Sequence, residues 1–125
     1  PSTPAADGVE LAGSNFDRCF AVAGRSSAIA RVAEGLRARN VTHQLLQIAY
    51  AFHSSQIDAV APLFLNSFTR GSYGAAGIPV VSCVYEAGVE QVREFSAEHW
   101  WSVVRKPINF RAAFSQFRRA HPRAT

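Results

Sequence analysis

The sequence predicts a small α/β domain, and three observations support this prediction. Short apolar runs bounded by Gly and Asn are typical of strands. Between them, apolar residues recur three and four positions apart, which is the spacing of a helix that buries one face. The chain has 125 residues, of which 48% are hydrophobic, and this is enough for one core. No apolar run approaches the ~20 residues of a membrane span, so we expect no membrane partner.

The first elements expected are two strands of a hairpin. Residues 1–8 are small and polar, and we expect a linker or a cut end there. Residues 9–14 have the pattern of a strand, residues 15–17 supply turn chemistry, and residues 18–23 have the pattern of a returning strand.

A helix is expected next, with Ser26 or Ser27 as its cap, and it should run to about Ala38. Serine at this place accepts a hydrogen bond from a backbone N–H that the helix leaves free. The apolar residues that should share its buried face are Ile29, Val32, Ala33 and Leu36.

The helix should end at Asn40, a residue that tolerates the left-handed conformation. Residues 41–51 are then expected to form a third strand. An order of strand, strand, helix and strand is most of a ferredoxin-like unit. We therefore assign residues 9–52 to an incomplete ferredoxin-like subdomain that lacks the first strand and helix.

The second half of the chain predicts a helix, a buried strand and two more helices. Residues 56–68 have helical spacing, and Pro62 inside them should kink or split the helix. Residues 78–84 are almost wholly apolar, as expected of a strand buried on both faces. Ser96 should cap a helix over residues 97–105, which Pro107 ends. The last helix should cover residues 110–120 and bury an aromatic stripe of Phe110, Phe114 and Phe117.

The charge of the chain bears on the kind of partner it could bind. The net charge is +4 and Lys106 is the only lysine, so arginine dominates. Arginine pairs well with phosphate and carboxylate, which suits an anionic partner, although the composition alone also explains the charge. The cluster Arg111, Arg118, Arg119 and Arg123 raises a nucleic-acid alternative, but neither zinc-finger spacing nor a stacking motif accompanies it.

Cys19 and Cys83 stand far apart in apolar runs, and the chain has no C-x-x-C motif. We therefore expect no metal site. Two buried thiols in a reducing cytoplasm are the default, and a disulfide between them stays open.

The most informative motif is Tyr50-Ala51-Phe52-His53, which ends an apolar run just before a helix-like segment. A histidine at such an edge can be aimed into a cleft by a rigid scaffold. The motif resembles the Tyr-Ala-Ser-His and His-Ala-Phe-His tetrapeptides of acyltransferase domains in modular polyketide synthases, relatives of malonyl-CoA:acyl-carrier-protein transacylase.

Further blocks resemble that family in the same order along the chain. They are VELAGSNFDRCFAVAG at residues 9–24, LRARNV at 36–41, IPVVSCV at 78–84 and HWWSVVRKPINF at 99–110. The resemblance implies that residues 53–125 form the C-terminal part of the large α/β-hydrolase-like subdomain.

The resemblance also implies roles for single residues. His53 would be the catalytic base, with Tyr50, Ala51 and Phe52 lining the pocket for the extender unit. Cys83 and Val103 would also belong to the substrate-binding residues. Cys83 stands where the family has Asn, and Val103 stands at a polar position beside the catalytic histidine. A backbone carbonyl there could still orient the imidazole. The other histidines are expected to be structural or on the surface: His43, His99 and His121.

The activity implied is transfer of a malonyl-type unit from CoA, through an acyl-enzyme, to the phosphopantetheine thiol of an acyl carrier protein. No further cofactor is implied. The family's nucleophile is the Ser of Gly-His-Ser-x-Gly, which this chain lacks. The expected partners are therefore the N-terminal half with that elbow, the carrier protein and neighbouring synthase domains, in the cytoplasm.

The choice of substrate rests on two bulky residues. Phe52 would fill the space of a substrate methyl group and favours malonyl, whereas Tyr50 is the methylmalonyl-like choice. We expect exclusion by size to dominate, since an overpacked pocket costs ~1–3 kcal/mol. The alternative to an enzyme is a non-catalytic remnant or a docking module, whose arginines would suit an acidic carrier protein.

Overall fold

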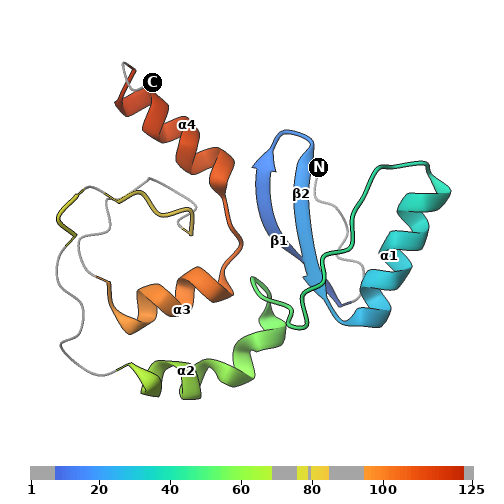
Figure 1. Cartoon of the computed structure of the whole chain (residues 1–125), viewed down its shortest axis with the longest axis horizontal. Coiled ribbons are helices and arrows are strands. Elements are labelled where there is room, and N and C mark those ends of the chain that lie inside the picture. The colour runs from blue at the N-terminus through green and yellow to red at the C-terminus, as the bar shows by residue number, and fades with distance from the viewer. Residues whose placement is uncertain (1–7, 69–75, 79, 85–94, 123–125) are drawn as a thin grey trace.

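The structure is a computed structural model, and it describes residues 8–68, 76–78, 80–84 and 95–122. In this part the chain is an α/β fold with one two-stranded sheet and four α-helices (Figure 1). The elements are β1 (Val9–Phe16), β2 (Cys19–Gly24), α1 (Ser26–Ala38), the 3₁₀-helix η1 (Ser55–Val60), α2 (Ala61–Ser67), α3 (Ala97–Arg105) and α4 (Phe110–Ala120).

The predicted hairpin is confirmed, because β1 and β2 pair antiparallel from Val9 opposite Gly24 to Phe16 opposite Cys19. The register shifts near Gly13 and again near the turn. The open end of the hairpin requires a glycine, since a Cβ on Gly24 would collide with the carbonyl oxygen of Gly8. This close approach lets β2 pass directly into α1.

Helix α1 lies beside β2 (Figure 1) and ends where the sequence predicts. Asn40 has a φ of 53°, so the left-handed stop is confirmed. The predicted serine cap is wrong: Arg25 is the N-cap and its side chain forms no capping bond. The buried face is centred on Ala28 and Ala33, and the predicted apolar residues Ile29, Val32 and Leu36 are half-buried.

The third strand predicted over residues 41–51 is wrong, because this segment forms no strand. A strand needs a partner for its N–H and C=O groups, and the described sheet contains only β1 and β2. Leu45 and Ile48 are accordingly 52% and 58% exposed. Residues 78–84, as far as they are described, contain one bridge residue, Val81, in place of the expected strand. A ferredoxin-like arrangement is therefore not seen among the described residues.

The helical region after His53 is split, as Pro62 predicts. η1 covers Ser55–Val60, and α2 begins at Ala61 with Pro62 in its first turn, where a proline is tolerated. The predicted bounds of α3 and α4 are both confirmed. Ser96 caps α3 by accepting a hydrogen bond from the N–H of His99 at 3.1 Å.

Helix α4 contacts β1, and its buried residue is a small one that does not belong to the predicted aromatic stripe. Ala113 is the buried residue of α4, whereas Phe110 and Phe114 are 40% and 50% exposed. The prediction that these two rings lie in the core is wrong. The helical spacing of the stripe places its rings on one face of α4, but this spacing does not decide which face packs against the rest of the chain.

The link between α3 and α4 fastens the C-terminal helices to the hairpin. Ile108 forms a parallel bridge with Gly13. Its N–H donates to the carbonyl of Ala12 at 2.9 Å, and its own carbonyl accepts from Ser14 at 2.8 Å. A Cβ on Gly13 would lie 3.4 Å from the carbonyl oxygen of Ile108. A side chain at Gly13 would therefore be in contact with Ile108, and it is the two backbone hydrogen bonds that join the end of α3 to β1.

The two cysteines are free, with Cys19 exposed and Cys83 half-buried. The expectation of a buried Cys19 is wrong because it lies beside the turn of the hairpin, where no element covers it. No helix in the described part is long and apolar enough to cross a bilayer. Among the same residues, no three or more His, Cys, Asp or Glu side chains gather into a group that could hold a metal ion.

Candidate functional site

The backbone of His53 is held in an unusual conformation by the end of α3. Its φ is 61°, in the left-handed region that costs a residue with a Cβ about 1–3 kcal/mol. The N–H of His53 donates to the carbonyl of Val104 at 2.9 Å. The last carbonyls of a helix have no partner within the helix, so His53 satisfies one of them while α3 holds the strained residue in place.

The ring of His53 is held from the same place. Its Nδ1 lies 2.9 Å from the carbonyl oxygen of Lys106. A carbonyl can only accept, so Nδ1 carries the proton of the neutral ring and Nε2 keeps a free lone pair. This is the tautomer that a general base needs. The sequence placed a possible orienting carbonyl at Val103, and the structure supplies it three residues later.

A pocket of about 490 Å³ lies beside this histidine. It is mainly apolar, as ligand pockets commonly are. Four of the residues predicted from the sequence meet in it, although they lie up to 51 positions apart: Phe52, His53, Cys83 and Val103. Ser82, Val84, Val104 and Ile108 complete its walls. The roles of these residues in binding or catalysis remain predictions.

The other two predicted residues lie outside this pocket. Tyr50 is 70% exposed, and its ring centre is 6.0 Å from that of Phe52. Ala51 is half-buried, and its carbonyl accepts a hydrogen bond from Oγ of Ser54 at 2.7 Å. Ala51 therefore shapes the turn that presents His53. Tyr50 contacts Phe52 in a tilted arrangement and remains largely exposed.

Cys83 contributes an apolar wall and not a reactive thiol. Burial raises the pKa of its thiol, so the sulfur stays protonated and weakly nucleophilic near neutral pH. Its carbonyl accepts a hydrogen bond from the N–H of Asn109 at 2.8 Å. This bond joins the segment around Cys83 to the start of α4.

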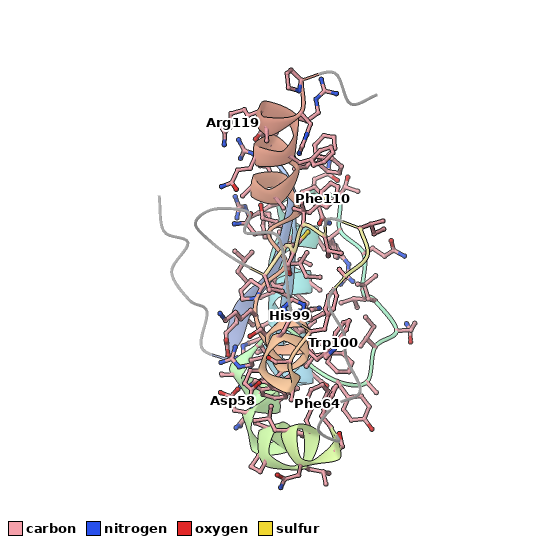
Figure 2. The ribbon with its side chains drawn as sticks, turned by 90° about the vertical axis from the view of Figure 1, so that its left-hand side faces the viewer. Asp58, Phe64, His99, Trp100, Phe110 and Arg119 are labelled. Atoms are coloured by element: carbon pink, nitrogen blue, oxygen red, sulfur yellow. The ribbon has the colours of Figure 1, made fainter. Side chains whose placement is uncertain are left out.

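Polar contacts surround the segment that follows His53. Arg105 at the end of α3 donates from Nε and Nη2 to the carboxylate of Asp58 in η1, the second bond being 3.2 Å. The hydrogen bond to Asp58 raises the pKa of Arg105. Glu10 of β1 accepts from the N–H of Ser55 at 3.0 and 3.1 Å and from its hydroxyl. Figure 2 shows Asp58 well away from Arg119 near the far end of α4.

The remaining histidines do not line the pocket. Nδ1 of His43 bonds the carbonyl of Val41 at 2.9 Å. His121 is exposed and packs on Phe117. His99 is 7% exposed, and burial lowers its pKa. It packs against Phe95 and against Trp100, which lies beside it in Figure 2, so it belongs to the packing around α3.

Sequence reasoning did not identify four of the pocket residues as site residues: Ser82, Val84, Val104 and Ile108. The sequence could have indicated them, because they lie in the blocks at residues 78–84 and 99–110 that resemble the family. Within these blocks, only the two departures from the family pattern, Cys83 and Val103, were predicted as site residues.

Known proteins resemble this chain over most of its length. Residues 2–125 match the family described as "Acyl transferase domain". The chain is 33% identical over 104 residues to the polyketide biosynthesis acyltransferase homolog BaeD of Bacillus velezensis, covering 83% of this chain and 31% of that protein. It is 31% identical over 112 residues to the corresponding homolog PksD of Bacillus subtilis, covering 90% and 34%. The chain thus spans about a third of the length of these curated relatives.

Solved structures share the fold. The acyltransferase domain from the second module of the salinomycin polyketide synthase superposes with a TM-score of 0.72 at 26% identity, covering 90% of this chain and 26% of that one. The malonyl-CoA:ACP transacylase of Synechocystis has a TM-score of 0.64 at 20% identity, covering 88% and 36%, and is evidence for the fold alone.

Proposed function

This chain belongs to the acyl transferase domain family, in the branch of polyketide synthases, and from that membership we propose that it is the base-bearing part of an acyltransferase. The complete domain would move a malonyl-type unit from CoA to the phosphopantetheine thiol of an acyl carrier protein. Of the catalytic groups, this chain supplies the base, His53. The serine nucleophile of a Gly-His-Ser-x-Gly elbow comes from outside its sequence.

One observation carries this proposal: the ring of His53 is fixed by the carbonyl of Lys106 in the tautomer of a base, beside an apolar pocket. A serine hydroxyl is a weak nucleophile at neutral pH without a base within hydrogen-bond reach. Histidine is suited to the task because its ordinary pKa is about 6.5. The backbone carbonyl both orients the ring and stabilises the proton on Nδ1.

In the first half-reaction, Nε2 of His53 would take the proton of the serine hydroxyl as the oxygen attacks the thioester carbon. The bond to sulfur breaks, and the histidine returns the proton to the leaving CoA thiolate. In the second half-reaction His53 would take the proton of the phosphopantetheine thiol, which attacks the acyl-serine. The serine then recovers its proton from the ring, so no proton is gained or lost.

The bulk of one pocket residue, Phe52, supports the proposal that the extender unit is small. Phe52 stands next to His53 and reduces the apolar space available to a substrate side chain. This favours malonyl over methylmalonyl. The acyl carrier protein and the neighbouring synthase domains are the proposed partners, and the cytoplasm is the proposed location. The chain's net charge of +4 would favour an acidic carrier protein.

The test of this function uses the chain joined to an acyltransferase segment that carries the Gly-His-Ser-x-Gly elbow. Replacing His53 by alanine should lower the rate of malonyl transfer about 100-fold to 10,000-fold, as expected for loss of a general base. The control is His43→Ala, which removes a histidine outside the pocket and should leave the rate unchanged. Near-full transfer by His53→Ala would disprove the proposed base and favour a docking module without catalytic function.

A further inference from the structure

The two contacts that hold His53 both end on the same short stretch of chain. The N–H of His53 donates to Val104, and its Nδ1 bonds Lys106, each at 2.9 Å. Arg105 is the residue between these two acceptors. The position of Arg105 relative to the segment around His53 therefore decides whether both hydrogen bonds can form.

Arg105 is tied to that segment through its side chain. Its guanidinium forms two hydrogen bonds with the carboxylate of Asp58, five residues after His53. Such a two-bond pair restricts direction as well as distance. The contacts close a ring that runs from His53 along the chain to Asp58, across the ion pair to Arg105, and back to His53 through the backbone carbonyls.

A second set of bonds anchors both sides of this ring to β1. Glu10 accepts from the N–H and the hydroxyl of Ser55, on the side of η1. Ala12 and Ser14 bond the backbone of Ile108, on the side of α3. Both η1 and the end of α3 are therefore attached to β1. The ion pair between Asp58 and Arg105 then limits how far η1 and the end of α3 can still move relative to each other.

We propose that the Asp58–Arg105 ion pair is a positioning device for His53, which keeps the carbonyl of Lys106 on Nδ1 and so leaves Nε2 as the proton acceptor. This inference rests on the proposed function of His53 as a base. The side chain of Arg105 is 26% exposed and that of Asp58 is 54% exposed, so the pair contributes little to overall stability. Its effect should appear in the state of the imidazole and in turnover.

The first test measures the tautomer of His53 in the full 125-residue chain, from the chemical shifts of its ring nitrogens by NMR at a pH where the rings are neutral. The unaltered chain should show His53 protonated on Nδ1. Asp58→Asn, which removes the charge and keeps the shape, should give a mixture of the two tautomers. The matched control is Asp17→Asn, which breaks the exposed ion pair between Asp17 and Arg111 and should leave the tautomer unchanged.

The second test measures kinetics in the complete domain described above. Asp58→Asn should lower kcat about twofold to fivefold, as expected for loss of an exposed pair, with KM for the acyl-CoA unchanged. The double variant Asp58→Arg with Arg105→Asp restores the attraction and should recover both kcat and the tautomer. Circular dichroism of each variant checks the fold, and the double variant keeps the test valid if Asp58→Asn unfolds.

The outcomes separate this inference from the proposed function. An unchanged tautomer in Asp58→Asn, or equal changes in Asp58→Asn and Asp17→Asn, would overturn the positioning role and leave His53 as the base. Full transfer by His53→Ala would instead overturn the proposed function, and with it the catalytic meaning of the ion pair, whatever the tautomer shows.

Discussion

At the scale of single residues, the proposed choice of substrate rests on Phe52. It lines the pocket, adjoins His53 and is 42% exposed. In the resembling Tyr-Ala-Ser-His tetrapeptide a serine stands at this position, and that tetrapeptide accompanies methylmalonyl. The proposed preference for malonyl therefore rests on the bulk of this ring.

Replacing Phe52 by serine in the complete domain should shift selectivity toward methylmalonyl. One methyl group in an apolar pocket is worth roughly 10-fold to 200-fold in discrimination, and we expect the low end because the other walls are unchanged. Competition between malonyl-CoA and methylmalonyl-CoA measures the ratio of the two rates. The comparison variant is Tyr50→Ser, which alters an exposed ring outside the pocket. A larger shift in Tyr50→Ser than in Phe52→Ser would assign selectivity to Tyr50.

At the scale of elements, α3 matters most because its C-terminal end holds His53. Its N-terminal end is fixed by Ser96, which accepts from the N–H of His99 at 3.1 Å. Its C-terminal end is fixed by His53 and by the ion pair of Arg105 with Asp58. The helix is thus bounded by polar contacts at both ends, and one of these ends belongs to the site.

Ser96→Ala should destabilise the chain by about 1 kcal/mol, the usual cost of losing a serine N-cap. The matched control is Ser26→Ala at the start of α1, where the serine forms no capping bond and alanine is the better helix former. Denaturation by urea, followed by circular dichroism, measures the free energy of unfolding of each variant. An equal loss in both variants would mean that the capping bond of Ser96 contributes nothing of its own.

At the scale of the whole molecule, the described part of the chain leaves many large apolar side chains exposed. Among them are Leu46, Tyr50, Leu63 and Ile78. The core is built around small residues such as Ala12, Ala28, Ala33 and Ala113, so close approach of backbones replaces bulk.

The 125-residue chain alone should gain no malonyl group from malonyl-CoA. It contains no Gly-His-Ser-x-Gly motif, and the serines beside His53 are engaged. Ser54 is fully buried and donates to the carbonyl of Ala51, while the hydroxyl of Ser55 donates to Glu10. Mass spectrometry of the intact chain after incubation detects any adduct. A stable malonyl group on a serine, and above all on Ser82 in the pocket, would show a nucleophile within this chain.

The sequence alone determined the local elements. The hairpin, the ends of α1 and the bounds of α3 and α4 were predicted closely, because a helix closes its hydrogen bonds within itself and a tight turn uses neighbouring residues. Asn40 and Ser96 act through their own backbone conformation or through bonds to nearby residues. The sequence also identified His53 as the candidate base, through the resemblance of its tetrapeptide.

Only the tertiary structure decided which residues meet. Residues 41–51 have the composition of a strand, but strand pairing depends on a partner elsewhere in the chain. The aromatic stripe of α4 has helical spacing, yet Ala113 is the buried residue of this helix. The carbonyl that orients His53 comes from Lys106, 53 residues away. Local sequence sets backbone conformation, whereas contacts between distant segments depend on how their surfaces pack. The pocket and the ion pair at Asp58 are contacts between distant segments, so only the tertiary structure could reveal them.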